Sequence, residues 1–309
     1  MITQHLSGIY GDITAMVLDF AFPIIAEAGE IAVRRPLGFF DVWLLPRVWL
    51  GAAFCLIGLV LLARFRVSQV LRLVFLAVAF FAFGVVLILP LGDFARGMSV
   101  HPSPICVVTK PFLFITAGRD VPLVFLSILA FVAAFSVVGN KLFCGWVCPI
   151  GAIQEGLHRI PLPRKFKIKL PFWVTNALRI ALYLVFLVIV FTAGVSIYDY
   201  FNPFEFLFWG FQIAIVMVFA ATLLAGVFLF RAFCYLICPI GLVTWVLEHL
   251  SVFKVRVNKE RCTACNVCVE ASPCPSVPAI LESKKSRPDC FACGRCIEVC
   301  PEKALGFRV

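Results

Sequence analysis

The sequence predicts an α-helical integral membrane protein of about five transmembrane helices with a small α+β domain at its C-terminus. Of its 309 residues, 62% are hydrophobic and the mean hydropathy is +1.02, whereas soluble domains are about half apolar. Charged residues make up only 14% of the chain, and eight cysteines crowd the segment 262–300. We therefore divide the chain into an N-terminal segment (1–42), a transmembrane domain (43–250) and a C-terminal domain (251–309).

Within the N-terminal segment, the stretch 12–31 is apolar except for one stripe of acidic residues. At about 100° per residue of a helix, that stripe collects Asp12, Asp19, Glu27 and Glu30, and Pro23 should kink the helix. We expect an interfacial helix on the outer membrane surface. The alternative is a sixth membrane helix whose acidic stripe faces a partner subunit. The first ten residues contain no Lys or Arg, so we expect no cleavable signal peptide.

Five apolar runs approach the roughly 20 residues that a membrane helix needs: 43–63, 71–91, 121–139, 178–198 and 206–230. Lys and Arg concentrate after the first, third and fifth runs. The positive-inside rule then places the C-terminal domain in the cytoplasm and the N-terminus outside, in a multi-pass protein of the cell inner (cytoplasmic) membrane. The net charge of +10 comes largely from these flanking residues, so we expect no nucleic-acid partner.

The transmembrane domain contains an internal repeat with its own cysteines. Residues 143–152 (FCGWVCPIGA) and 233–242 (FCYLICPIGL) match at six of ten positions. A two-fold relation between the copies would bring Cys144, Cys148, Cys234 and Cys238 into one four-sulfur site, and we expect a short helix after the first copy, at 150–160. Four interpretations stay open: an iron–sulfur cluster, another metal site, a redox-active dithiol or disulfide, and plain packing of buried cysteines at helix ends.

The C-terminal domain carries the cysteine spacing of a bacterial two-cluster ferredoxin, in which the fourth cysteine of each run binds the other cluster. By that rule one [4Fe–4S] cluster is held by Cys262, Cys265, Cys268 and Cys300, and a second by Cys290, Cys293, Cys296 and Cys274. Zinc sites and disulfides are the weaker alternatives; four-cysteine zinc sites usually show paired C-x2-C knuckles, not triplets. We expect an α+β two-cluster ferredoxin-like domain, and a cluster at the repeat would be the third.

Taken together, these motifs resemble those of the NapH group of membrane iron–sulfur proteins. The similarity covers residues 70–309 and rests on Lys141 to Pro149, Asn202–Pro203, Cys234 to Gly241 and the eight later cysteines. The NapH group supplies quinol dehydrogenase subunits, including those that serve periplasmic nitrate reductase. The polyferredoxin part of NosR and the assembly protein CcoG resemble the chain more loosely. Members of such families typically have four membrane helices, so the run at 43–63 is additional here.

The resemblance implies quinone as substrate, the membrane lipid and quinone pool as surroundings, and subunits of a larger redox complex as partners. A quinone site needs a proton-handling group at the membrane edge, and we expect Asp93 and His101 in the outer connections to supply it. Glu155 and His158, just beyond the first C-x3-C-P motif, are the alternative at the cytoplasmic edge.

Several function classes lack their motifs in this sequence. There is no C-x-x-C-H for covalent haem, no G-x-G-x-x-G or Walker A for a nucleotide, and no Ser/His/Asp grouping for hydrolysis. We assign no catalytic residue and predict an electron-transfer subunit that couples quinol oxidation (or quinone reduction) to a partner enzyme. The alternatives are a copper reductase or assembly factor and a membrane redox sensor, each using the C-x3-C-P thiols.

Overall fold

The computed structural model of the chain describes residues 38–309 apart from 65–66, 87–88, 90–91, 100–102, 208–211 and 285–287. Two predictions therefore lie outside the described residues: the helix at 12–31 and the position of His101. Asp93 belongs to α4 (Gly92–Met98), but its side chain also lies outside the described part of the chain.

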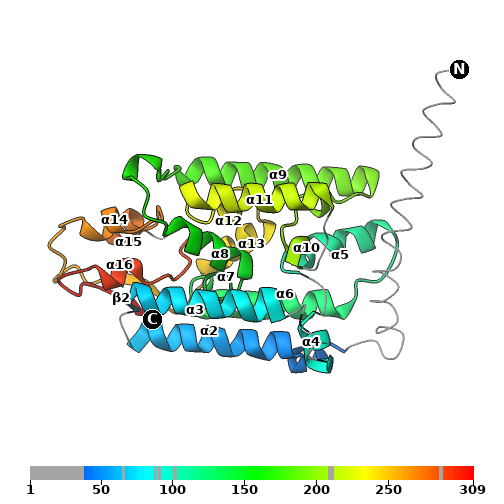
Figure 1. Ribbon diagram of the computed structural model, residues 1–309, viewed down its shortest axis with the longest axis horizontal. Coiled ribbons are helices and arrows are strands. Elements are labelled where there is room, and N and C mark those ends of the chain that lie inside the picture. The colour runs from blue at the N-terminus through cyan, green and yellow to red at the C-terminus, as the bar shows by residue number, and fades with distance from the viewer. Residues whose placement is uncertain are drawn as a thin grey trace, which may run out of the picture.

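Five apolar helices run along the long axis of the molecule (Figure 1). They are α2 (Pro46–Arg64), α3 (Gln69–Phe80, extended by a π-helical turn, η2, Phe81–Val85), α6 (Leu123–Val138), α9 (Phe172–Ala193) and α11 (Ile213–Phe228). Among the described residues, α2 and α9 are long and apolar enough to cross a membrane, and the other three are apolar but shorter. All five predicted runs contain a helix, while the number that span a membrane stays a prediction.

Large apolar side chains point outward from these helices. Val188 on α9 and Leu224 on α11 are 62% and 64% exposed, and similar residues line the outer faces of α2 and α3. Continuous exposed apolar surface of this kind is unusual on a soluble protein. It is what a helix that contacts lipid presents.

The helix ends differ from the predicted runs where proline, glycine or a separate turn intervenes. Helix α6 follows Pro122 and stops before Gly139. Helix α9 ends at Gly194, which has a left-handed φ of 66° that suits a residue without Cβ. The run predicted at 206–230 was too long, because its first residues belong to α10 (Phe204–Leu207) and α11 begins only at Ile213.

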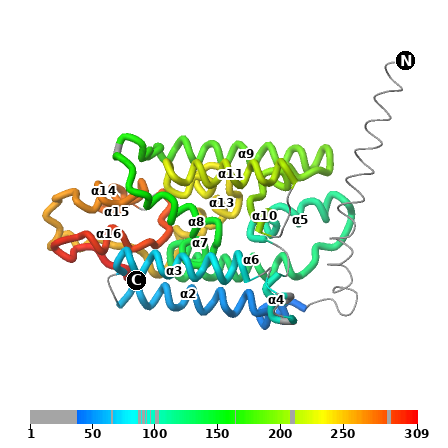
Figure 2. Tube along the Cα trace, in the orientation of Figure 1, coloured from blue at the N-terminus to red at the C-terminus, as the bar shows by residue number. Residues whose placement is uncertain are grey.

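Between α9 and α11 on one side and α2, α3 and α6 on the other lie short helices (Figure 2). They are α7 (Leu142–Trp146), α8 (Pro149–His158), α12 (Ala232–Leu236) and α13 (Pro239–Glu248). The predicted helix at 150–160 is thus present as α8. Proline opens both α8 and α13, in the first turn where its missing N–H costs nothing, and Cys148 and Cys238 are the extended N-cap residues.

The two copies of the repeat are related by an approximate two-fold arrangement. Helix α8 packs against α3 and α11, and its counterpart α13 packs against α9 and α6. The connections match as well, because Gly139 after α6 bridges to Phe253 after α13, and Leu229 after α11 bridges to Ile168 after α8. Each copy therefore completes its packing with the long helix of the other copy.

Short elements join and close the bundle. The connections contain η1 (Asp41–Leu44), α4, α5 (Cys106–Thr116), η4 (Arg164–Phe166), η5 (Ile197–Asp199) and α10. In the C-terminal domain, β1 (Lys254–Val257) pairs antiparallel with β2 (Leu305–Arg308), with Lys254 opposite Arg308. Three short helices, α14 (Val267–Ala271), α15 (Val277–Leu281) and α16 (Arg295–Glu298), lie between these strands in the sequence. This domain sits at one end of the helix bundle (Figure 1).

Candidate iron–sulfur sites

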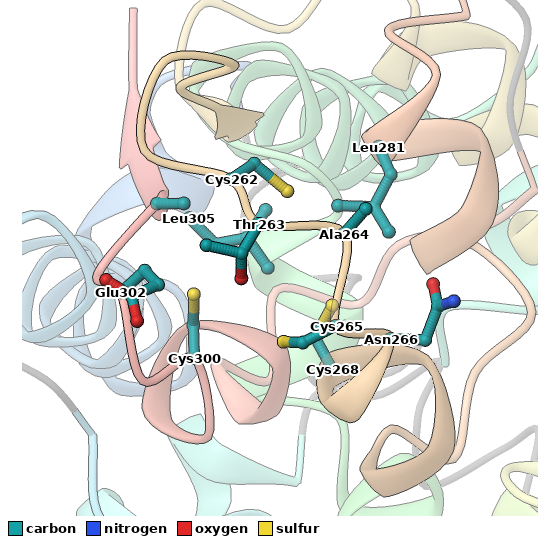
Figure 3. A pocket seen from close by; sticks show the side chains of 11 residues that line it. Cys262, Thr263, Ala264, Cys265, Asn266, Cys268, Leu281, Cys300, Glu302 and Leu305 are labelled. Atoms are coloured by element: carbon teal, nitrogen blue, oxygen red, sulfur yellow. The ribbon is translucent and has the colours of Figure 1, made fainter.

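The outermost group of cysteines lines a pocket in the C-terminal domain, and we call it the distal group: Cys262, Cys265, Cys268 and Cys300. Figure 3 shows their side chains around one space, from the loop before α14, from α14 itself and from the turn after α16. Left-handed residues Ala264 and Asn266, at φ of 54° and 57°, fold that loop. Cys265 is exposed and Cys262 partly exposed, so this group lies at the surface.

The second group, Cys274, Cys290, Cys293 and Cys296, is buried throughout, and we call it the proximal group. Its loop repeats the distal conformation, with Ala292 and Gly294 at φ of 47° and 78°. The thiol of Cys296 interacts electrostatically with the other three and with Cys268 of the distal group. The proximal and distal groups are therefore neighbours.

These thiols need a positive partner to become ligands. Burial, reinforced by the neighbouring Cys293, raises the pKa of the Cys274 thiol to about 12, and burial also raises the pKa of Cys290. A bound metal centre deprotonates such thiols outright. Within the described chain, no three His, Cys, Asp or Glu side chains close around a single metal ion.

The four cysteines of the internal repeat line a third pocket, which we call the cradle: Cys144, Cys148, Cys234 and Cys238. All four are buried. Matching residues from both copies complete the walls, with Phe143 and Phe233 and with Ile150 and Ile240. Pro104, between α4 and α5, and Phe204 of α10 close the pocket. The two-fold arrangement thus brings the two C-x3-C-P motifs together around one space.

Two cations flank the cradle at equivalent positions, each three residues before a motif. Lys141 and Arg231 both have left-handed backbones, at φ of 56° and 50°, and both are fully buried. The ammonium of Lys141 donates to the carbonyl of Gly241 at 2.9 Å, and the guanidinium of Arg231 donates to the carbonyls of Cys144 and Gly145. Each cation therefore ties its own copy to the other, and their charge favours thiolates in the cradle.

Buried carboxylates balance these cations. Glu155 accepts from Arg72 at 2.9 Å, from Arg231 at 2.7 Å and from Arg159 at 2.9 Å. Three guanidinium groups therefore occupy the oxygens of Glu155, and its expected role at a quinone site stays a prediction. His158 is half-buried against Phe230, at 5.6 Å between ring centroids.

Sequence reasoning missed this network. It counted Arg72, Lys141, Arg179 and Arg231 only among the basic residues between the apolar runs and did not predict that all four are buried in ion pairs. A signal was present in the repeat itself: a basic residue stands three positions before the first cysteine of both copies. A flanking charge has no reason to keep that register.

The segment 289–292 anchors the proximal group to the repeat. Asp289 pairs with Lys141 and, at 2.8 Å, with Arg179. The ring of Phe291 lies 5.2 Å from the ammonium of Lys141 and 4.7 Å from the guanidinium of Arg231, within range of cation–π attraction. Trp146 donates to the carbonyl of Ala292 at 3.0 Å. Cys290 therefore sits in a segment held directly against both copies of the repeat.

A family model described as a 4Fe-4S binding domain matches residues 121–171 and 211–258. Those two segments contain the two C-x3-C-P motifs and hence all four cradle cysteines, whereas the proximal and distal groups lie outside them. The matched family therefore corresponds to the repeat.

Relatives extend the similarity over most of the chain. The ferredoxin-type protein NapH of Haemophilus influenzae is 32% identical over 212 residues, which is 62% of this chain and 71% of that protein. An uncharacterised protein of Methanocaldococcus jannaschii is 28% identical, covering 69% of this chain and 82% of that protein. The methylamine utilization ferredoxin-type protein MauN of Methylorubrum extorquens is 25% identical, covering 60% and 66%. No solved structure matches the chain.

Proposed function

The chain belongs to the NapH family of ferredoxin-type iron–sulfur electron-transport proteins, and from that premise we propose that it exchanges electrons between quinol and a partner redox enzyme. The observation that carries the proposal is the succession of cradle, proximal group and distal group, which leads from inside the helix bundle to the protein surface. A subunit of this kind needs no catalytic residue of its own, since its work is to bind, position and insulate redox centres.

We assign one [4Fe–4S] cluster to each group of four cysteines. The spacing of the eight C-terminal cysteines supports the distal and proximal assignments. For the cradle, the family match over both motifs and the buried cations Lys141 and Arg231 support a third cluster, because a cluster with four thiolate ligands carries net negative charge. The clusters supply one-electron transfer, and the protein sets their potentials through burial and nearby charge.

Several clusters in series suit the stoichiometry of quinol. Oxidation of one quinol releases two electrons and two protons. Clusters held by the three cysteine groups would take up these electrons singly and pass them to the partner, and the protons would leave to water. In the reverse direction quinone takes up two of each.

The proposed location is the inner (cytoplasmic) membrane with the C-terminal domain in the cytoplasm. The apolar outer faces of the five helices support insertion in lipid, and the distribution of Lys and Arg along the sequence supports the orientation. Cys265 is exposed, so the distal group is the place where a partner subunit would receive or deliver electrons.

An anaerobic titration of the purified protein with a reduced quinol analogue tests the function. We expect the broad visible absorbance of the clusters to bleach with quinol, using dithionite as the full-reduction control. Bleaching by dithionite alone would overturn the quinone-coupled role and would direct attention to the copper-handling and sensor alternatives.

A matched pair of variants tests the third cluster. We expect Cys148→Ala to lower the iron content by one cluster, about four atoms per chain, while the ferredoxin-type clusters remain. Cys55→Ala is the control, because Cys55 is another buried thiol but lies outside the three groups. Unchanged iron in Cys148→Ala would leave the dithiol and packing interpretations of the cradle.

A further inference from the structure

A second pocket adjoins the cradle, and we call it the side slot. It is lined by Arg47, Val48, Phe83, Pro104, Ile128, Phe131, Phe143, Val147 and Pro149. The first two residues come from α2, and the others come from η2, α6, α7, the start of α8 and the connections around them. Phe143 and Pro104 line the cradle as well, so the two pockets share a wall.

The position of the side slot places any occupant beside a cradle cysteine. Val147 and Pro149 are the chain neighbours of Cys148, and both line the slot. Electron transfer falls steeply with distance, so a redox-active molecule in this slot would be well placed to exchange electrons with a centre in the cradle.

The slot combines apolar walls with one cation. Its lining is aromatic and aliphatic apart from Arg47, which is half-buried in the first turn of α2 and close enough to Cys148 for their charges to interact. Guanidinium groups donate strong hydrogen bonds to oxygen acceptors. The chemistry therefore suits a flat apolar ring that carries an oxygen acceptor, and not a lipid tail, which has no acceptor.

The slot lies toward the end of the bundle opposite the C-terminal domain. Arg47 is at the beginning of α2, whereas Leu62 near its other end lies beside Gly294 of the proximal loop. Figure 1 shows α2 running from the neighbourhood of β2 to α4. The order along the molecule is thus side slot, cradle, proximal group and distal group.

We propose that the side slot binds the headgroup of a quinone, with an oxygen of the ring accepting from Arg47 and the ring packed against the wall that Phe131 and Phe143 form together. This rests on the proposed function and gives that function a location. The proposed site requires neither Asp93 nor His101.

Binding of 2-heptyl-4-hydroxyquinoline N-oxide, a fluorescent quinone analogue, tests the proposal without relying on turnover. Titration of the purified full-length protein should quench the probe at saturating protein. We expect Arg47→Met to weaken binding about tenfold or more, as loss of a hydrogen bond from a charged donor would, and Ile128→Trp to weaken it by filling the slot.

Matched controls separate the slot from general damage. Arg64→Met removes an exposed cation at the other end of α2, and Ile57→Trp enlarges a side chain that is already 48% exposed on the same helix; both should bind the probe as the native protein does. Cluster absorbance and the thermal unfolding midpoint establish that each variant is folded.

The outcomes distinguish failure of the side slot from failure of the proposed function. Normal probe binding by folded Arg47→Met and Ile128→Trp would overturn the side slot but leave quinone coupling intact, provided that quinol still bleaches the native clusters. If the native protein neither binds the probe nor bleaches with quinol, the proposed function itself is wrong. Selective loss in the two slot variants supports both.

Discussion

Glu155 shows how a single buried charge can organise this protein. Burial alone would raise the pKa of its carboxyl, but the guanidinium groups of Arg72 and Arg231 outweigh burial and hold the pKa well below its ordinary value. The carboxylate is therefore ionised throughout the physiological range. Arg72 also donates to the carbonyl of Gly145 at 2.7 Å, and Arg231 to that of Cys144, so Glu155 positions two side chains that hold the backbone of the first motif.

Removing this carboxylate should be costly. Glu155→Gln leaves Arg72 and Arg231 buried without a compensating charge, and breaking such a pair from one side destabilises by about 3–5 kcal/mol. Chemical unfolding in detergent, followed by cluster absorbance, measures the loss. Glu260→Gln, at an exposed position, should change the free energy of unfolding by less than about 0.5 kcal/mol. Equal stabilities for the two variants would contradict a structural role for the Glu155 network.

His158 should make stability depend on pH. Burial, with the nearby Lys167, lowers the pKa of its imidazole from 6.5 to about 4, and Lys169 and Arg159 act in the same direction against Glu155. Between about pH 6.5 and 4, His158 is therefore protonated in the unfolded chain but remains neutral in the folded chain. Stability should fall as the pH drops from about 6.5 to 4 and be unaffected by this residue above that window. His158→Phe should flatten this part of the thermal unfolding midpoint against pH, whereas an unchanged slope would assign the effect to other groups.

At the residue scale, the cysteines could be predicted and their charged surroundings could not. A cluster fixes the spacing of its ligands along the chain, so the twelve positions in three groups are visible in the sequence. Lys141 and Asp289 are 148 residues apart, and no local pattern links them. The same limit applies to Arg47, which looks like an ordinary helix-flanking charge until α6 and α7 pack beside it.

At the element scale, the short helix α7 works as a docking surface for the C-terminal domain. An added Cβ at Gly145 would collide with the backbone carbonyl of Phe291, and backbone cannot move aside as a side-chain tip can. Trp146 next to it donates to Ala292. The glycine therefore permits the close approach on which the contact between the repeat and the proximal loop depends.

Gly145→Ala should push α7 and the proximal loop apart. We expect it to displace the 289–292 segment, lower occupancy of the proximal cluster and slow its reduction by a quinol analogue, as followed by electron paramagnetic resonance and iron analysis. Gly156→Ala in α8 is the control, because nothing lies within 4 Å of a Cβ added there and alanine favours helix. Normal cluster occupancy and reduction in Gly145→Ala would mean that the contact between α7 and the 289–292 segment tolerates displacement and is not needed for electron transfer to the proximal cluster.

The long helices were predictable because their apolar runs are continuous in sequence. The exact ends of these helices were harder to predict. The predicted run 206–230 merged α10 with α11, because Phe-rich turns and Phe-rich helices have the same hydropathy. The two-fold relation between the copies of the repeat predicted a common four-sulfur site but not the pairing of α8 with α11 and of α13 with α6. Hydropathy by itself carries no information about which helices pack together.

At the scale of the whole molecule, the proposed centres form a line with one end inside the bundle and the other at the surface. The cradle is closed by apolar residues of both copies, the proximal group is buried, and only the distal group has exposed cysteine. A large soluble acceptor can therefore reach only the distal end. This asymmetry gives the relay an order that can be tested from both ends.

Removing a cysteine from the distal group and removing one from the cradle should produce different defects in electron transfer. Cys265→Ala, in the distal group, should leave quinol-driven bleaching of the remaining clusters but abolish electron delivery to cytochrome c, a protein acceptor too large to enter the bundle. Cys238→Ala, in the cradle, should block quinol-driven bleaching of the proximal and distal clusters while dithionite still reduces them. Thr263→Ser is the control: Thr263 lines the distal pocket, and the change keeps the charge of the pocket and all four sulfurs, so this variant should behave like the native protein. If Cys238→Ala bleached normally with quinol, electrons would have to enter beyond the cradle, and the linear order would be wrong.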